Sequence, residues 1–408
     1  MIYLDHAAAT PVSEKVLSAM APYMTDSFFN PSAPYLPAAK VRQAYETAKN
    51  QIANFIGAKG NDLVITSGAT EANALAFTAV SCSVFDLLER GDELRKNNVS
   101  TSGKTAKSAT KVLVLETEHA SVLENAKSYP YETIKVDQTG LIDLADLKQK
   151  LTDNVELVSV SLANNELGTI QPLAEISELV KTTRLDRLKR GITTPIYLHS
   201  DASQGLALID LNVSRLGVDL LTLNAAKVGG PKGVGALYVA HGVKLTPYVY
   251  GGGQERGLRS GTENVAGAIG FAKALELLNG HQSAKRKKYT RLVEILKNEL
   301  KDAKVEPLFL GNKKHQLANF LPVSFPGLDA ERLIFALEDR EVYLSTGAAC
   351  SASKGEPSHV LKAIGLSDEG IKGSLRISLG VLNNEENIKQ AGKIIKEIVN
   401  DEYERSRK

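Results

Sequence analysis

The chain has 408 residues, of which 43% are hydrophobic and 24% charged, so it can bury a large core and divide into two lobes without metals or disulfides. Its net charge of +2 gives no reason to expect nonspecific nucleic-acid binding. The only two cysteines, Cys82 and Cys350, argue against a disulfide framework and for a reducing compartment. We find no basic leader followed by an apolar stretch, and no apolar run of about 18 residues. We therefore expect a soluble cytoplasmic protein.

Up to about residue 260, short β-rich runs alternate with longer amphipathic stretches. The runs lie within residues 62–68, 111–118, 157–168, 196–205, 218–227 and 233–240, and helices are expected from about Ala69, near Ser121 and over 173–183. Strands separated by helices predict an α/β fold with a mostly parallel sheet and helices on both faces. Catalytic groups in such sheets gather beyond the carboxyl ends of the strands.

From about Gly261 the pattern changes. A long helix is expected over 284–303, then strands near 319–327, 342–347 and 374–380, and a charged terminal helix. This pattern predicts a smaller α+β lobe. The polar segment 87–110 shows neither the hydrophobic periodicity of a helix nor that of a strand, which favours a surface insertion.

Residues 62–77 predict a strand, a tight turn at Ser67 and Gly68, and a helix beginning at Ala69 and Thr70. The free amides and positive end of such a helix suit a phosphate, and Thr70 adds a hydroxyl. A simple helix cap is the more common explanation of this pattern taken alone.

Polar side chains follow several of the predicted strands. His119 follows one strand, where an imidazole can stack on a flat cofactor or shuttle protons. Asn165 follows the next, and Asp201 and Gln204 follow another. A carboxylate beside a pyridine nitrogen keeps that nitrogen protonated, and amides can bond a ring hydroxyl. A structural histidine and an ordinary helix-capping aspartate are the alternatives.

Two cationic residues are further candidates. Lys227 follows an apolar strand, where a desolvated amine can form a Schiff base, although a lysine that leads into solvent is an equal alternative. Arg376 lies on a predicted strand, and its planar guanidinium suits a substrate carboxylate or a plain surface ion pair. The loop 251–264 combines glycines with two arginines, so its backbone amides and guanidinium groups can bind an anion. A flexible surface loop is the alternative.

Cys350 lies among small residues in GAACSAS. A thiolate there is reachable and nucleophilic, and a site without large hydrophobic neighbours is a poor one for a packing cysteine. We interpret Cys350 as a nucleophile, whereas Cys82, in AFTAVSCSVF, is expected to be a packing residue.

Taken together, the motifs resemble those of the NifS/IscS-type cysteine desulfurases, which are class-V aminotransferases of the fold type I pyridoxal-phosphate enzymes. The resemblance covers nearly the whole chain in the family's order: YLDHAAATPV, NPSAP, TSGATEANALA, TEHASVL, NNELGTIQP, SDASQG, AAKVGGPKGVGALYV, GGGQERGLRSGTEN, STGAACSAS, EPSHVL and SLRISLG.

The resemblance implies an aspartate-aminotransferase-like architecture. Its seven-stranded, mostly parallel sheet belongs to a large cofactor-binding domain over 13–260. Residues 261–408 form a small domain that carries the Cys350 loop, and residues 1–12 pack with that domain.

The resemblance also implies a role for each candidate residue with pyridoxal 5′-phosphate as cofactor. Lys227 forms the Schiff base and moves the proton. Cofactor contacts are assigned to Ala69, Thr70, His119, Asn165, Asp201, Gln204 and Asn224, and, from the neighbouring subunit of a homodimer, Thr262. Arg376 and Asn165 hold the substrate carboxylate, and His119 is counted with Lys227 and Cys350 as catalytic.

The implied reaction removes sulfur from L-cysteine, giving L-alanine and a persulfide on Cys350 that passes to an acceptor for iron-sulfur cluster assembly or tRNA thiolation. No resident metal is expected, although Cys350 is a candidate transient ligand of an iron-sulfur cluster. No membrane or direct nucleic-acid partner is expected.

Two positions depart from the family pattern. The residue before the lysine is Ala226, where the family has histidine, and Asn224 replaces a frequent serine. Asn224 still donates to a phosphate, but Ala226 has no polar side chain, which predicts weaker cofactor retention. Tyr35 takes the place of another histidine, which affects how the substrate pocket is positioned.

Two alternatives remain open at this point. The first is a selenocysteine lyase or another pyridoxal-phosphate lyase, which differs in its product. The second is a non-catalytic scaffold that binds a partner, which Ala226 favours and the presence of Lys227, Asp201, His119 and Cys350 opposes.

Overall fold

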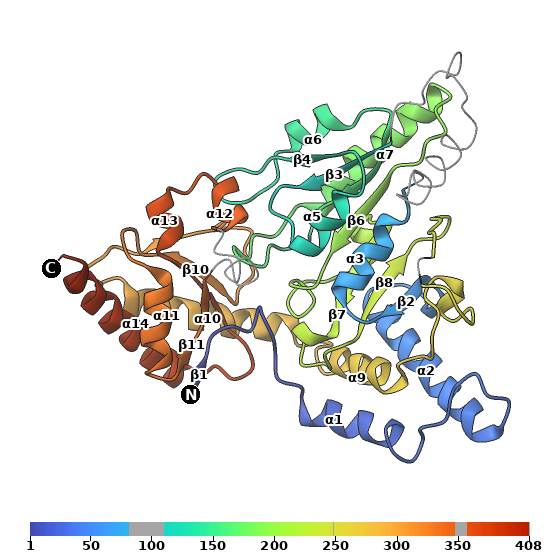
Figure 1. The fold of residues 1–408 in the computed structure, drawn as a ribbon, viewed down its shortest axis with the longest axis horizontal. Coiled ribbons are helices and arrows are strands. Elements are labelled where there is room, and N and C mark those ends of the chain that lie inside the picture. The colour runs from blue at the N-terminus through green and yellow to red at the C-terminus, as the bar shows by residue number, and fades with distance from the viewer. Residues whose placement is uncertain (81–109, 248, 347–356, 408) are drawn as a thin grey trace, which may run out of the picture.

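A seven-stranded sheet lies at the centre of the larger lobe (Figure 1), with strand order β2-β8-β7-β6-β5-β3-β4. Its strands are β2 (Leu63–Thr66), β3 (Lys111–Leu115), β4 (Tyr131–Ile134), β5 (Val155–Ser159), β6 (Tyr197–Asp201), β7 (Leu220–Asn224) and β8 (Gly235–Val239). Strand β8 runs opposite to the other six strands, which are parallel to one another. The predicted α/β class and mostly parallel sheet are confirmed. The computed structural model describes residues 1–80, 110–247, 249–346 and 357–407.

Alternating side chains of these strands enter two separate cores, which explains the helices on both faces. Val112 and Val114 pack into one core with residues of α3 (Ala69–Phe77) and α5 (Ala120–Ala126). Leu113 and Leu115 face the other core. The helices of that second face include α2 (Leu36–Phe55), α7 (Leu173–Lys189) and α9 (Val265–Glu276). The remaining helical segments of this lobe are α1 (Glu14–Met20), η1 (Ala21–Tyr23), η2 (Gly60–Asp62), α6 (Leu144–Lys150), α8 (Val213–Leu216), η3 (Ala225–Lys227) and η4 (Glu255–Gly257).

The smaller lobe packs helices on a four-stranded antiparallel sheet of order β12-β13-β10-β9. The strands are β9 (Leu308–Phe309), β10 (Phe320–Ser324), β12 (Ser345–Thr346) and β13 (Ser374–Ser378), and the helices are α10 (Gln282–Leu300), α11 (Ala330–Glu338), α12 (His359–Ala363), α13 (Asp368–Lys372) and α14 (Glu385–Ser406). The chain start adds β1 (Ile2–Tyr3), which pairs in parallel with β11 (Val342–Tyr343). Ile2 and Leu4 lie in the core of this lobe.

The packing of α9 bears on the boundary between the lobes, which the sequence pattern places at 260/261. Helix α9 packs on α1 and α2, and its buried residues from Val265 to Leu275 join the core of the larger lobe, as does Leu278. Tyr289 of α10 is buried in the other core. We therefore propose that the boundary lies between α9 and α10. The predicted insertion 87–110 falls, apart from Thr110, outside the described residues.

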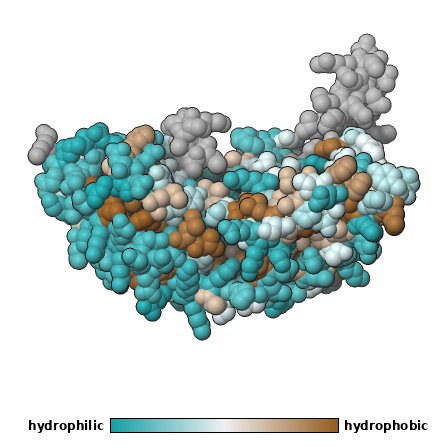
Figure 2. All heavy atoms as spheres, turned by 90° about the horizontal axis from the view of Figure 1, so that it is seen from below, coloured by the Kyte–Doolittle hydropathy of each residue, from teal (hydrophilic) through white to brown (hydrophobic). Residues whose placement is uncertain are grey.

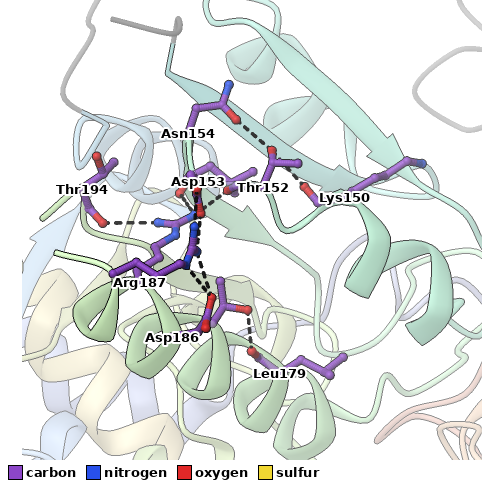
Figure 3. A network of polar contacts seen from close by, with 11 residues as sticks. Lys150, Thr152, Asp153, Asn154, Leu179, Asp186, Arg187 and Thr194 are labelled. Atoms are coloured by element: carbon purple, nitrogen blue, oxygen red, sulfur yellow. Dashed lines mark hydrogen bonds and ion pairs between the residues drawn. The ribbon is translucent and has the colours of Figure 1, made fainter. Parts of the chain in front are cut away.

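A buried arginine connects the end of α7 to the central sheet (Figure 3). The Arg187 guanidinium donates to the carbonyl oxygens of Thr152 at 2.6 Å and Val155 at 2.8 Å. It also donates to Thr194 at 3.3 Å, and its burial lowers its pKa. Three carbonyl oxygens thus hold a cation that would otherwise be costly to bury.

Among the described helices, none is both long and apolar enough to cross a membrane.

Candidate active site

The carboxyl ends of the central strands open on one cavity of about 300 Å³, the place where ligands bind in doubly wound sheets. The N-terminal segment and β13 of the smaller lobe complete its wall. The cavity is lined by Ala7, Ala8, Ala69, Thr70, His119, Ser121, Ser161, Ala163, Asn165, Asp201, Ser203, Gln204, Asn224, Lys227 and Arg376. Nearly all of the predicted site residues therefore lie together.

The turn after β2 presents a helix N-terminus to the cavity. Gly68 is the N-cap of α3, with φ of 153°, and it has no side chain to accept from the first amides of the helix. The backbone of Gly235 lies so close that a side-chain carbon there would contact the Gly68 backbone at 2.8 Å. Ala69 and Thr70 therefore bring free amides and a hydroxyl to the cavity wall, an arrangement that suits an anion.

His119 is the N-cap of α5, and its ring is held by Ser121. The Ser121 amide donates to His119 Nδ1 at 3.1 Å, and the Ser121 hydroxyl lies 2.8 Å from the same nitrogen. Because a backbone amide can only donate, Nδ1 is an acceptor, and a neutral ring carries its proton on Nε2. Burial lowers the pKa of His119, and the charge of Lys227 acts in the same direction.

Asp201, at the end of β6, is oriented by two donors. The Ser203 amide donates to Oδ1 at 2.8 Å, and Asn73 Nδ2 donates to Oδ2 at 2.9 Å. Asn73 Nδ2 also lies 2.9 Å from Ser121 Oγ. Asn73 is fully buried in α3 and thus connects the carboxylate to the residue that holds His119. Sequence reasoning missed Asn73, although an amide within the apolar run of a helix was a usable signal.

Lys227 lies in η3, directly after β7, and contacts the start of the chain. Its Nζ donates to the carbonyl oxygens of Ala7 at 2.8 Å and Ala8 at 2.7 Å. Gln204 Nε2 donates to the same Ala7 oxygen at 3.0 Å. Asn224 caps η3, with Oδ1 accepting from the Ala226 amide. The amine is thereby aimed at the cavity by backbone groups more than 200 residues away in the sequence.

Arg376 reaches the cavity from β13 of the smaller lobe. Its Nη2 donates to Asp5 Oδ1 at 2.8 Å, and its Nη1 donates to the carbonyl oxygen of Asn165 at 3.3 Å. Burial raises the pKa of Asp5, while Arg376 opposes that shift. Arg376 Nε is buried and has no hydrogen-bond partner in the described part of the chain. The arginine is therefore held in place by groups of the larger lobe and of the chain start.

Two buried carboxyl groups lie directly behind the cavity. Glu118, next to His119, accepts from the Ser161 amide, and burial raises its pKa to about 8. Glu166, next to Asn165, accepts from Ser358, and burial raises its pKa to about 7. Glu118 was not predicted as a site residue, because a sequence does not show which of its acidic residues is buried.

One predicted site residue in the described part of the chain does not line this cavity. Thr262 is exposed, in the loop before α9, and does not line it. Cys350 lies outside the described residues. Ala226 does not line the cavity, and its carbonyl accepts from the Thr10 hydroxyl at 2.9 Å.

The donor set fits pyridoxal phosphate. The cavity holds an amine, a carboxylate fixed by two donors, a neutral imidazole and an uncapped helix N-terminus. These are the groups needed for an aldehyde, a pyridine nitrogen, a ring face and a phosphate. Ser203 Oγ, buried at the cavity wall, also has no partner among the described residues.

The comparisons with known proteins agree with this geometry. The model of the aminotransferase class-V family matches residues 2–391. A protein of Archaeoglobus fulgidus named cysteine desulfurase IscS 1 is 38% identical, over 95% of this chain and 94% of its own length. Cysteine desulfurase IscS of Dictyoglomus turgidum is 36% identical, over 98% of this chain and 94% of its own.

Solved structures show the same relationship. A structure described as a NifS-like protein has a TM-score of 0.82 and 30% identity, over 98% of this chain and 99% of its own. A structure described as SspA in complex with cysteine has a TM-score of 0.74 and 31% identity, over 93% of this chain and 99% of its own.

Proposed function

The chain belongs to the aminotransferase class-V family, and we propose that it is a cysteine desulfurase that converts L-cysteine to L-alanine and transfers the sulfur to an acceptor. One observation carries the proposal. Asp201 ends β6 and Lys227 follows β7 in the larger lobe, Arg376 lies in the middle of β13 in the smaller lobe, and all three line one cavity. That set combines an amine, an acid and a carboxylate clamp, which a scaffold that only binds partners does not need.

We propose pyridoxal 5′-phosphate as the cofactor. When bound, it supplies an electron-withdrawing ring that stabilises negative charge on the α carbon of the substrate. Thr70 and the first amides of α3 would hold its phosphate, with Asn224 beside them. Asp201 would face the ring nitrogen, His119 would stack on the ring, and Gln204 with Asn165 would lie on the side of the ring oxygen.

Lys227 moves the proton in this proposal. Its Nζ is directed by the carbonyl oxygens of Ala7 and Ala8, which are neutral acceptors and leave the amine able to take up and return a proton. The proton leaves the α carbon of the substrate. After the sulfur has left, one proton is delivered to the β carbon, which completes the methyl group of alanine, and one is returned to the α carbon.

Arg376 and Asn165 would bind the substrate carboxylate. The guanidinium already lies against the carbonyl oxygen of Asn165, and Asp5 fixes its orientation on the opposite side. A planar guanidinium held in this way can bind a carboxylate without moving far, because its fork geometry is preorganised.

Cys350 would accept the sulfur. Its thiolate attacks the sulfur atom of the substrate, the bond between that sulfur and the β carbon breaks, and a persulfide remains on Cys350 while the carbon fragment keeps the electron pair. This assignment rests on the sequence motif, since Cys350 lies outside the described residues. The persulfide would then pass to an acceptor for iron-sulfur cluster assembly or tRNA thiolation.

We also propose a homodimer in which Thr262 reaches the phosphate site of the neighbouring subunit. Thr262 is exposed and outside its own cavity, as that role requires. The face formed by α1 and the start of α2 carries apolar groups among hydrophilic ones (Figure 2), and Met24, Phe28 and Leu36 there are each more than 60% exposed. Exposed apolar side chains of this size are typical of interfaces.

We propose a cytoplasmic location from the low cysteine content.

The test incubates the protein with pyridoxal phosphate and L-cysteine, then measures alanine and the persulfide on Cys350. We expect equal amounts of both products, no alanine from Lys227→Ala, and no persulfide from Cys350→Ser. Alanine formation that persists in Lys227→Ala would reject the mechanism. Selenide release from selenocysteine with little sulfide from cysteine would assign the chain to selenocysteine lyases instead.

A further inference from the structure

Four consecutive cationic residues lie at the beginning of α10: Lys285, Arg286, Lys287 and Lys288, here called the α10 basic cluster. The last three are exposed, and Lys285 is half-buried. None of the four forms an ion pair with another residue that the structure describes. The cluster is therefore a concentrated positive charge on a chain whose net charge is only +2.

The cluster lies at the unfavourable end of its helix. The first turn of α10 contains no acidic residue, and His281 supplies no side-chain cap. The N-terminus of a helix carries a partial positive charge that acts over about one turn, so Lys285, in the first turn, reduces helix stability. Lys285 and Lys288 are also three residues apart and repel each other, which contributes with burial to the lowered pKa of Lys285. An anionic partner would relieve both effects.

Exposed aliphatic residues border the cluster. Helices α10 and α14 lie side by side (Figure 1), and Arg291 forms a 2.6 Å ion pair with Glu385 at the start of α14. Just before that point, Val381 is 61% and Leu382 46% exposed.

The buried side chain of His6 lies between the α10 basic cluster and the turn that carries Val381 and Leu382. A side-chain carbon at Gly380 would meet the His6 ring at 2.2 Å, and the charge of Lys288 contributes, after burial, to the low pKa of His6. Gly380 directly precedes the two aliphatic residues. The α10 basic cluster and Val381 with Leu382 thus border one surface of the smaller lobe.

Arg286 and Lys287 share one exposed side of α10 with Ser283, Thr290, Arg291 and Glu294. Two residues of the cluster therefore lie together on a polar, solvent-facing side of this helix.

We propose that this surface of the smaller lobe docks an acidic segment of a partner protein that also carries aliphatic side chains. Positive charge beside exposed aliphatic residues matches such a segment, because the charges steer the encounter and the apolar contacts add affinity. A single-stranded nucleic acid would need aromatic rings on which to stack, and Tyr289, the aromatic residue next to the cluster, is buried. The site is separate from the cavity and does not depend on the reaction there.

The test uses the full chain loaded with cofactor and a fluorescein-labelled peptide of alternating glutamate and leucine residues. Arg286→Glu with Lys287→Glu reverses two charges of the cluster. Lys389→Glu with Lys393→Glu, on the exposed side of α14, is the control with the same change in net charge. We expect the first pair to weaken peptide binding by about tenfold or more at about 150 mM salt, while the control pair stays close to the wild type.

Three further measurements decide the proposal. Val381→Ser with Leu382→Ser should weaken binding of the glutamate–leucine peptide and leave a glutamate–serine peptide unaffected. Cysteine desulfuration and the unfolding temperature should be unchanged in all of these variants, because the substituted side chains are exposed and lie outside the cavity. The proposal would be overturned if both charge reversals weakened peptide binding equally, or if the acidic peptide did not bind at all. It would also be overturned if a single-stranded RNA bound more tightly than the peptide and the cluster variant lost that RNA binding.

Discussion

The Ser358 hydroxyl donates a 2.6 Å hydrogen bond to Glu166 Oε2 across the boundary between the two lobes. Both residues are buried. Glu166 follows Asn165 of the cavity, and Asn164 Oδ1 accepts from the Glu166 and Leu167 amides, which keeps this turn rigid. Leu167 also packs against Val360, Leu361 and Ile364, so a small apolar core lies beside the hydrogen bond. The position of Asn165 therefore depends on the smaller lobe.

Glu166 predicts a defined pH dependence of stability. Burial raises its pKa from 4.5 to about 7, so the folded state holds a proton that the unfolded state releases. The stabilising contribution is complete below pH 4.5 and is lost as the pH rises through 7. Comparison with Glu166→Gln isolates it, because glutamine keeps an acceptor for Ser358 and does not titrate.

We expect the difference in unfolding free energy between wild type and Glu166→Gln to fall by up to about 1.4 kcal/mol per pH unit in that window. Urea denaturation at several pH values measures it. The control Ser358→Ala removes a hydrogen bond that lowers the pKa of Glu166 and should extend the window upward. Parallel curves for wild type and Glu166→Gln would show that Glu166 does not titrate there.

Asn73→Asp should raise the activation free energy of the reaction by more than it lowers the free energy of unfolding. The replacement keeps the shape of the side chain but places a carboxylate where Asn73 Nδ2 now donates to Asp201 and Ser121. Loss of a hydrogen bond to a buried charged group costs roughly 1.5–3 kcal/mol, or about 10- to 100-fold in rate if it is expressed in the transition state.

The measurement is the pH profile of kcat/KM, which should shift as the charge near His119 and Asp201 changes. Asn54→Ala, at an exposed position of α2, is the control and should leave the profile in place. An unshifted profile with normal kcat in Asn73→Asp would contradict a positioning role for Asn73.

Ala226→His should tighten pyridoxal phosphate binding, since the family pattern has a histidine donor at this position, two residues after Asn224 of the proposed phosphate site. A charge-assisted hydrogen bond contributes about 1.5–3 kcal/mol, so the dissociation constant should fall about tenfold or more. Equilibrium dialysis against the cofactor measures this without turnover. Ala226→Phe, which adds a ring without nitrogen, should not tighten binding. An unchanged or weaker affinity in Ala226→His would reject the idea that the alanine weakens the phosphate site.

Arg376→Lys should raise KM for L-cysteine by about tenfold and change kcat less. Lysine keeps the charge but loses the fork that meets Asp5, Asn165 and a carboxylate at once. Steady-state kinetics on L-cysteine measures both constants, and Arg332→Lys, on an exposed helix of the same lobe, is the control. A drop in kcat with unchanged KM would instead place Arg376 in the chemical step.

Much of the site could be predicted because of one geometric rule. His119, Asp201 and Lys227 each follow a strand, and the carboxyl ends of parallel strands share one edge of the sheet. The roles of these residues came from the family resemblance, since a polar residue after a strand has many possible uses. Asn73 was missed because its contacts with Asp201 and Ser121 are formed only between distant segments.

The amino-acid sequence by itself determined the alternation of strands and helices, the polar residues at the strand ends and the excess of cations at 285–288, because these depend on local periodicity and composition. Only the tertiary structure decided that Ala7 and Ala8 direct Lys227, that α9 belongs to the larger lobe, and that Glu166 is buried against Ser358. A periodic pattern shows that one face of a segment will be buried. It does not show against which partner, since that choice depends on how all the segments pack together.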